Sequence, residues 1–212
     1  DEQDSIPSSS LYDVDDKKKY PLSFIKYYKF KSLNQFHDSY SDSLLPPFGA
    51  NLFSVVLAKK HLRKIMSEFF RNFGFQVVMK ADEKKFEIQK QTEDMIFSYP
   101  YIMTSDTLQR IIFYVIAMES NQNATLVFEE PESHAFPYYT KFLGEKIALD
   151  ESNQYFIATH NPYLLSAILE KAPEDALNVF ITYFKDFAAY YIFFKKFNNF
   201  EYNYYKKTKM KK

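Results

Sequence analysis

The chain has 212 residues, of which 46% are hydrophobic and 25% charged, with 27 basic and 27 acidic side chains and no cysteine. A chain of this length can bury one sizeable core, its balanced charge gives no sign of a nucleic-acid partner, and the lack of cysteine excludes disulfides and thiolate metal sites. It has no apolar run long enough to cross a bilayer and no signal-peptide pattern, so we expect a cytoplasmic protein without a membrane partner.

The first half of the chain predicts a linker and a lobe. Residues 1–43 are polar and typical of an N-terminal segment and linker, and a start at Asp1 rather than Met indicates a fragment or a processed chain. Residues 44–104 predict a lobe in which a hairpin over 75–80 and 85–89 follows one helix over 50–70. The expected inward face of that helix consists of Leu52, Val55, Val56, Lys59 and Leu62.

Residues 105–194 alternate helices and strands and predict an α/β core. A helix capped by Ser105 or Thr104 precedes an apolar strand that ends at Glu129 and Glu130. Two prolines then bracket a turn, and a helix beginning at Pro137 leads to a second apolar strand over 154–161. This pattern predicts a mainly parallel sheet flanked by helices, with a further helix from Asn161 and Pro162 and a strand over 176–184.

Polar residues end both strands of this core. Glu129 and Glu130 end the first, and His160 ends the second. Since the carboxyl ends of parallel strands share one edge of the sheet, where ligands bind, we expect these three residues at a common site.

These segments resemble a known family. Phe128-Glu-Glu-Pro-Glu-Ser-His134 is similar to the Walker B segment of ATP-binding-cassette (ABC) ATPases, and Ala158-Thr-His-Asn-Pro162 to their switch-histidine loop. The relatives implied are soluble AAA-type ATPases of DNA repair and phage defence, including overcoming-lysogenization-defect and abortive-infection ATPases. The resemblance covers about Leu44 to Leu169 and implies a P-loop NTPase fold.

The resemblance also implies roles for the residues of the site, with ATP and magnesium as cofactors. Glu129 would hold magnesium through water, and Glu130 would polarise the water that attacks the γ-phosphate. His160 would contact that phosphate. Glu132 and His134 match the Pro-Glu-x-His part of the pattern as supporting residues without an assigned step.

The helix before Walker B takes the place of the family's signature helix, which binds the ATP held by another subunit and so implies a homodimer. Ser105 falls on the signature serine, and Gln109 and Arg110 fall on a recurring polar pair. A helix N-terminus with a hydroxyl favours anions because of its free N–H groups and its dipole. Thr107 stands where the family has glycine, which departs from the pattern.

No Gly-x-x-x-x-Gly-Lys-Ser/Thr is present, and the three glycines stand in unrelated contexts. We therefore expect the C-terminal part of a longer ATPase, inactive on its own. Two alternatives stay open. One is a non-catalytic interaction domain of the same fold. The other is a metal-dependent nuclease, with a metal held by Glu129, Glu130, Glu132, His134 and His160.

The C-terminal part is rich in aromatic residues, and its last stretch, 195–212, is a basic tail. Residues 188–194 fit either a strand or a short helix. The aromatic and lysine side chains could stack and neutralise single-stranded nucleic acid, which keeps DNA as a candidate partner. The other interpretation is that the aromatics belong to a core and the lysines to a solvated end.

Overall fold

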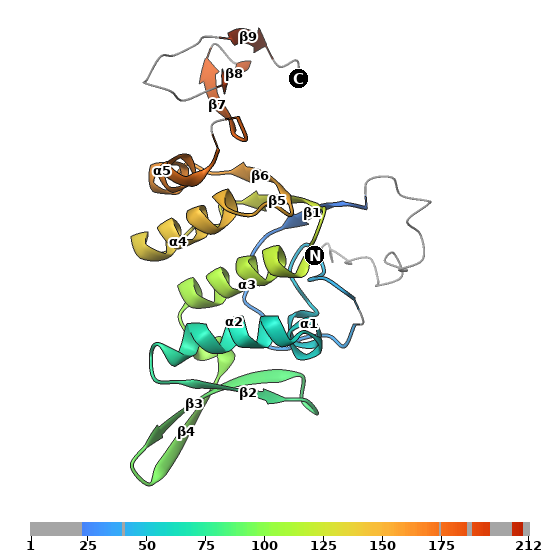
Figure 1. The fold of residues 1–212 in the computed structure, drawn as a ribbon, viewed down its shortest axis with the longest axis vertical. Helices are drawn as coiled ribbons and strands as arrows, with labels where there is room; N and C mark the ends of the chain where they lie inside the picture. Colours follow the sequence, from blue (N-terminus) through green and yellow to red (C-terminus); the bar gives the residue numbers. More distant parts are fainter. Residues whose placement is uncertain (1–22, 40, 174, 186–187, 196–204, 210–212) are drawn as a thin grey trace, which may run out of the picture. The chain divides into compact units, whose positions relative to one another are not determined.

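The computed structural model describes residues 23–39, 41–173, 175–185, 188–195 and 205–209 (Figure 1). It has two compact units, Asp1–His134 with Ser152–Ala158, and Ala135–Glu151 with Thr159–Lys212. Residues 1–22 and most of the predicted basic tail lie outside the described residues.

The first unit contains the predicted parallel sheet. It is built from β1 (Ile25–Tyr28), β5 (Thr125–Glu129) and β6 (Gln154–Ala158), in the order β1-β5-β6 with both pairs parallel. β5 is the central strand, which explains its apolar sequence. β1 lies in the range expected to be a linker, so that expectation is wrong for Ile25–Tyr28.

Aromatic rings pack helix α3 (Asp106–Ser120) against this sheet. The ring of Phe113 lies 6.0 Å from that of Tyr28, and the ring of Tyr114 lies 4.8 Å from that of Phe128. Nearly the whole helix is buried. Ser105 caps it as predicted, because its Oγ accepts from the Leu108 N–H at 3.2 Å.

The predicted single helix over 50–70 is two helices, α1 (Leu52–Ala58) and α2 (Lys60–Arg71). Lys59 interrupts it in an extended conformation, with φ −109° and ψ 116°, and its ammonium group donates to the carbonyl of Asp42. The break between the two helices thus coincides with a tertiary contact, which the helical spacing of apolar residues could not predict. The rest of the predicted inward face is buried: Leu52, Val55, Val56 and Leu62.

The predicted hairpin is present and belongs to a three-stranded antiparallel sheet. β2 (Gln76–Lys80) and β4 (Met95–Pro100) both pair with β3 (Lys85–Thr92), and the sequence analysis missed β4. A short 3-10 helix, η1 (Tyr101–Met103), leads from β4 to Ser105. Phe86 of β3 anchors the sheet, since its ring lies 5.0 Å from that of Phe53 and 5.6 Å from that of Tyr101.

The second unit pairs α4 (Pro137–Ala148) with α5 (Pro162–Lys171). A Cβ on Gly144 would lie 2.7 Å from the Cβ of Ala167, so only glycine permits this close approach. Phe136 is the N-cap residue of α4 and is exposed.

A third sheet in this unit contains β7 (Asn178–Lys185), β8 (Ala188–Lys195) and β9 (Tyr205–Lys209), all antiparallel. The strand predicted over 176–184 corresponds to β7, and 188–194 is a strand rather than a helix. Among the helices that the structure describes, none is long and apolar enough to cross a membrane.

Candidate functional site

The carboxylate of Glu129, the last residue of β5, receives two donors from the neighbouring strand β1 and the residue after it. The Tyr27 hydroxyl and the Lys29 ammonium group both donate to Oε2, the latter at 3.2 Å. The hydrogen bonds from Tyr27 and then from Lys29, together with the Lys29 charge, lower the pKa of the Glu129 carboxyl. The same hydrogen bond raises the pKa of Tyr27. Glu129 is a site residue predicted from the sequence, whereas neither Tyr27 nor Lys29 was predicted.

Glu130 has left the strand. Its backbone is left-handed, with φ 42°, and its N–H donates to the Ala158 carbonyl of β6 at 2.8 Å. The Ser133 hydroxyl donates to Glu130 Oε2 at 3.1 Å. The bond of its N–H fixes the backbone of Glu130 in this uncommon conformation, and the bond to its carboxylate orients the side chain.

The turn after Glu130 is hydrogen-bonded to the beginning of α3. The carbonyl of His134, a second residue with positive φ (58°), accepts from the Thr107 hydroxyl at 2.9 Å. Thr107 is 7% exposed, so its side chain points into the unit. Glu132 is buried at 3% exposure, whereas His134 is exposed. The helix that begins at Ser105 and the acidic turn are therefore connected directly.

Tyr114 of α3 connects the ends of β1 and β5. Its hydroxyl accepts from the Phe30 N–H at 3.3 Å and is 3.4 Å from the Glu129 carbonyl, to which it donates. Burial raises the pKa of this phenol to about 12, so it keeps its proton at neutral pH. Glu129 thus has a side chain held by β1 and a carbonyl held by α3.

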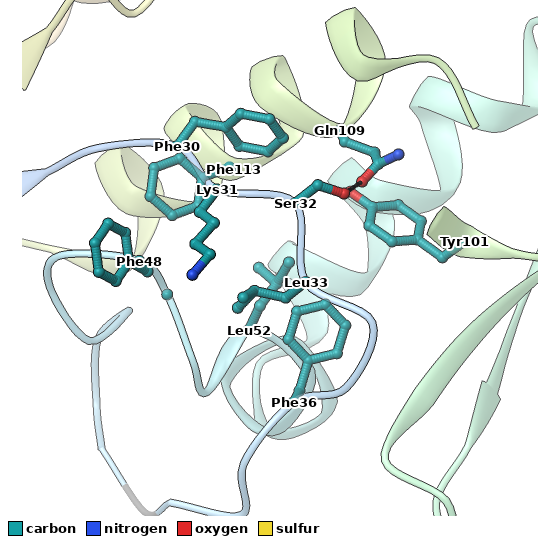
Figure 2. Close-up of a pocket in the computed structure, with 11 residues that line it drawn as sticks. Phe30, Lys31, Ser32, Leu33, Phe36, Phe48, Leu52, Tyr101, Gln109 and Phe113 are labelled. Atoms are coloured by element: carbon teal, nitrogen blue, oxygen red, sulfur yellow. Dashed lines mark hydrogen bonds between the residues drawn. The ribbon is translucent and has the colours of Figure 1, made fainter. Parts of the chain in front are cut away.

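The polar pair of α3 is engaged inside the first unit. Gln109 is 4% exposed, accepts from the Ser32 hydroxyl at 2.7 Å and donates to the Thr104 carbonyl at 2.9 Å. Figure 2 shows Gln109 and Ser32 at the wall of a crevice lined mainly by aromatic and leucine side chains. The Arg110 guanidinium lies 4.6 Å from the centre of the Phe30 ring and 3.2 Å from the Asp106 carboxylate. Both side chains stabilise the local fold.

His160 belongs to the second unit and is exposed. It follows Ala158, the β6 residue in register with Glu129, by two positions in the chain. Asn161 is the predicted N-cap, and its Oδ1 accepts from the Tyr163 N–H at 2.9 Å. The loop therefore begins at the carboxyl edge of the sheet and ends at a well-capped helix.

The described residues give no support to the alternative of a five-ligand metal site. In the part of the chain that is described, no three His, Asp or Glu side chains come together as a metal-binding group. The reason is that Glu129 faces β1, Glu130 is bonded to Ser133 and Glu132 is buried. Magnesium needs less, because it is usually bound by one or two carboxylates together with water and substrate phosphates. The exposed carboxylate of Glu129 fits that mode.

Comparisons with known proteins found likeness in structure only. No protein-family model matches the chain, and no curated protein matches it. One similar structure comes from work on the structural biochemistry of ATP-driven dimerization and DNA-stimulated activation of SMC ATPases. The match covers 66% of this chain and 88% of that chain. Its TM-score is 0.46 and its identity 12%.

A second similar structure is the Smc head domain with an extended coiled coil, bound to the C-terminal domain of ScpA, derived from Pyrococcus furiosus. It has a TM-score of 0.46 and 13% identity, and the match covers 68% of this chain and 37% of that one. These identities are too low to carry over an activity or a site residue.

Proposed function

We propose that this chain is the C-terminal part of an ABC-type ATPase that binds and hydrolyses ATP as a dimer. One observation carries the proposal. Glu129 ends the central strand of a parallel sheet, Glu130 follows it directly, and the turn after them is hydrogen-bonded to the start of α3. This arrangement places acids and a helix N-terminus at one sheet edge, as a nucleotide site requires.

Each site residue takes a role in this proposal. Glu129 holds magnesium through water, and the metal, when bound, offsets the negative charge of the phosphates. Glu130 orients and polarises the attacking water, for which its fixed turn conformation suits it. His160 contacts the γ-phosphate, and the turn residues Glu132 and His134 support the acidic edge.

Ser105 completes the site of a second copy in the proposed dimer. Its backbone lies at the exposed start of a 15-residue helix, and the Thr107 side chain points into its own unit rather than toward an incoming phosphate. The threonine in place of glycine is therefore compatible with an anion at this helix end. DNA repair or phage defence, with DNA as a further ligand, is the biological setting that the sequence motifs favour.

Strand β6 is the edge strand of the described parallel sheet and is partly exposed. Parallel strands are normally covered on both faces, yet Phe156 of β6 is 55% exposed, and Gln154 and Ala158 are exposed as well. In the proposed whole protein, a strand that carries the P-loop would pair with β6 at this edge.

The first test is ATP binding by the 212-residue chain, measured by calorimetry. We expect neither micromolar affinity nor turnover, because no P-loop is present to hold the phosphates. The same chain joined behind the P-loop segment of its own reading frame should bind and hydrolyse ATP. A reading frame without that segment, or a joined protein without ATP binding, would contradict the proposal and favour a non-catalytic interaction domain.

A further inference from the structure

The Glu129 carboxylate is bound by two donors that the proposed mechanism does not use. Tyr27 and Lys29 are two positions apart, so they project from the same side of the β1 backbone. Both donate to Oε2, and Lys29 is the ion-pair partner of Glu129 among the described residues. The ammonium group therefore occupies the place where a cation is expected.

Lys29 is held in this position by its backbone. Its N–H donates to the Pro47 carbonyl at 3.0 Å, and the next N–H, of Phe30, donates to the Tyr114 hydroxyl at 3.3 Å. The side chain itself is 51% exposed, so it can exchange partners without unpacking the core. A fixed backbone with a movable ammonium group suits a residue that changes between two anions.

The neighbouring cations are engaged elsewhere. Lys31 Nζ lies 5.6 Å from the centre of the Phe48 ring, and Arg110 is paired with Asp106. In the described part of the chain, Lys29 is the lysine bonded to the acid that ends β5. An ammonium group binds a carboxylate or a phosphate oxygen with similar chemistry, and it competes with a metal for the carboxylate.

We propose that Lys29 is a phosphate-binding residue that occupies the Glu129 carboxylate until a divalent cation displaces it. The proposal rests on the proposed function. When the metal takes Glu129, the ammonium group moves to an oxygen of the incoming phosphate chain, and no covalent bond changes. The chain thus supplies a phosphate-binding lysine of its own besides any lysine of a P-loop.

The first experiment titrates the 212-residue chain with Mn²⁺ alone and follows NMR line broadening at the Glu129 and Glu130 amides. Because Lys29→Met removes the internal competitor, we expect Mn²⁺ to bind about 2- to 5-fold more tightly, the range of an exposed ion pair. Lys31→Met, a matched exposed lysine, should leave the affinity unchanged. Glu129→Gln should remove the broadening.

The second experiment uses Mg²⁺-tripolyphosphate as the probe and measures its affinity by calorimetry, in comparison with that of the metal alone. In Lys29→Met, the ratio of the two affinities should fall by about 2- to 5-fold, because the phosphate loses its ammonium contact. Lys29→Arg keeps the charge and should stay near the wild type. A residue that only stabilised the fold would change both affinities by the same factor and leave their ratio unchanged.

Unchanged or weaker Mn²⁺ binding in Lys29→Met, or no broadening at Glu129 in that variant, overturns the exchange. An unchanged affinity ratio overturns the phosphate contact. Amide chemical shifts away from the site, recorded in the same spectra, verify that each variant is folded. The proposed ATPase function is tested separately by the joined protein, so Lys29 can fail here while ATP hydrolysis stands.

Discussion

Two glutamates of the first unit have the same kind of hydrogen-bond partners, but these partners lie at very different distances along the sequence. Glu87 on β3 accepts from the Ser98 hydroxyl and pairs with Lys80, both on the adjacent strands of one antiparallel sheet. Glu129 accepts from Tyr27 and Lys29, which are 102 and 100 residues away in sequence. Both carboxyls have lowered pKa values for the same physical reason.

The difference is in what the rest of the fold does around each acid. Glu87 lies within a sheet whose strands follow one another, so its partners come with the hairpins themselves. Glu129 ends a strand at the edge where three distant segments meet, and its backbone is also bonded to Tyr114. We therefore interpret the hydrogen bonds of Glu87 as a surface network and those of Glu129 as part of a candidate site. Glu87 and its neighbours provide matched controls.

The largest expected difference between the two regions is in catalysis. In the joined protein, Glu130→Gln should lower the rate of ATP hydrolysis by about 10²- to 10⁴-fold, because it removes the carboxylate that polarises water. Nucleotide binding should persist, since size and hydrogen bonding are kept. Glu87→Gln should leave the rate unchanged. Steady-state phosphate release measures both, and equal rates in wild type and Glu130→Gln would move the catalytic role elsewhere.

The effect on dimerisation should differ between replacing Ser105, at the candidate site, and replacing Ser98, on the antiparallel sheet. Ser105→Arg should weaken ATP-dependent dimerisation at least about fivefold, because overpacking alone costs about 1–3 kcal/mol. Ser98→Arg, on exposed β4, should have little effect. Light scattering with a non-hydrolysable ATP analogue measures the dimer. If Ser105→Arg dimerises as well as the wild type, the signature-helix assignment is wrong.

Stability should distinguish two buried tyrosines in the same way. Tyr114→Phe should lower the free energy of unfolding by about 1–2 kcal/mol, because it removes the hydroxyl that bonds Phe30 and Glu129. Tyr101→Phe should lower the free energy of unfolding less, because the ring of Tyr101 keeps its packing against Phe70 and Phe86. Urea unfolding of the 212-residue chain measures both. If Tyr101→Phe lowered the free energy of unfolding more than Tyr114→Phe, the edge of the sheet would not depend on the Tyr114 hydroxyl.

The smallest effect concerns pH. Both carboxyls have folded pKa values below the ordinary 4.5, so the unfolded chain binds more protons in acid. The stability that each contributes is complete above about pH 4.5 and is lost as the pH falls through the folded value. Carboxyl ¹³C NMR titration should show Lys29→Met raising the pKa of Glu129 alone. A matching change at Glu87 would indicate a general charge effect instead.

The elements that depend on local sequence were predicted well. Helical spacing and capping residues located α3 and α5, because Ser105 and Asn161 bond to N–H groups two or three residues away. The apolar run before Glu129 predicted a buried strand for the same reason, since its own residues fill the core. The candidate acids followed from that strand end and from the family motif.

Contacts between distant residues could be decided only by the tertiary structure. β1 has two exposed apolar residues, and the alternation of exposed Tyr27, buried Tyr28 and the following Lys29 was the weak signal available. Its pairing with β5 aligns residues 100 positions apart, and no local propensity encodes that register. The break at Lys59 likewise comes with a bond to Asp42, on another segment. The sequence therefore determined which acid ends the strand, and packing decided which lysine and which phenol bind to Glu129.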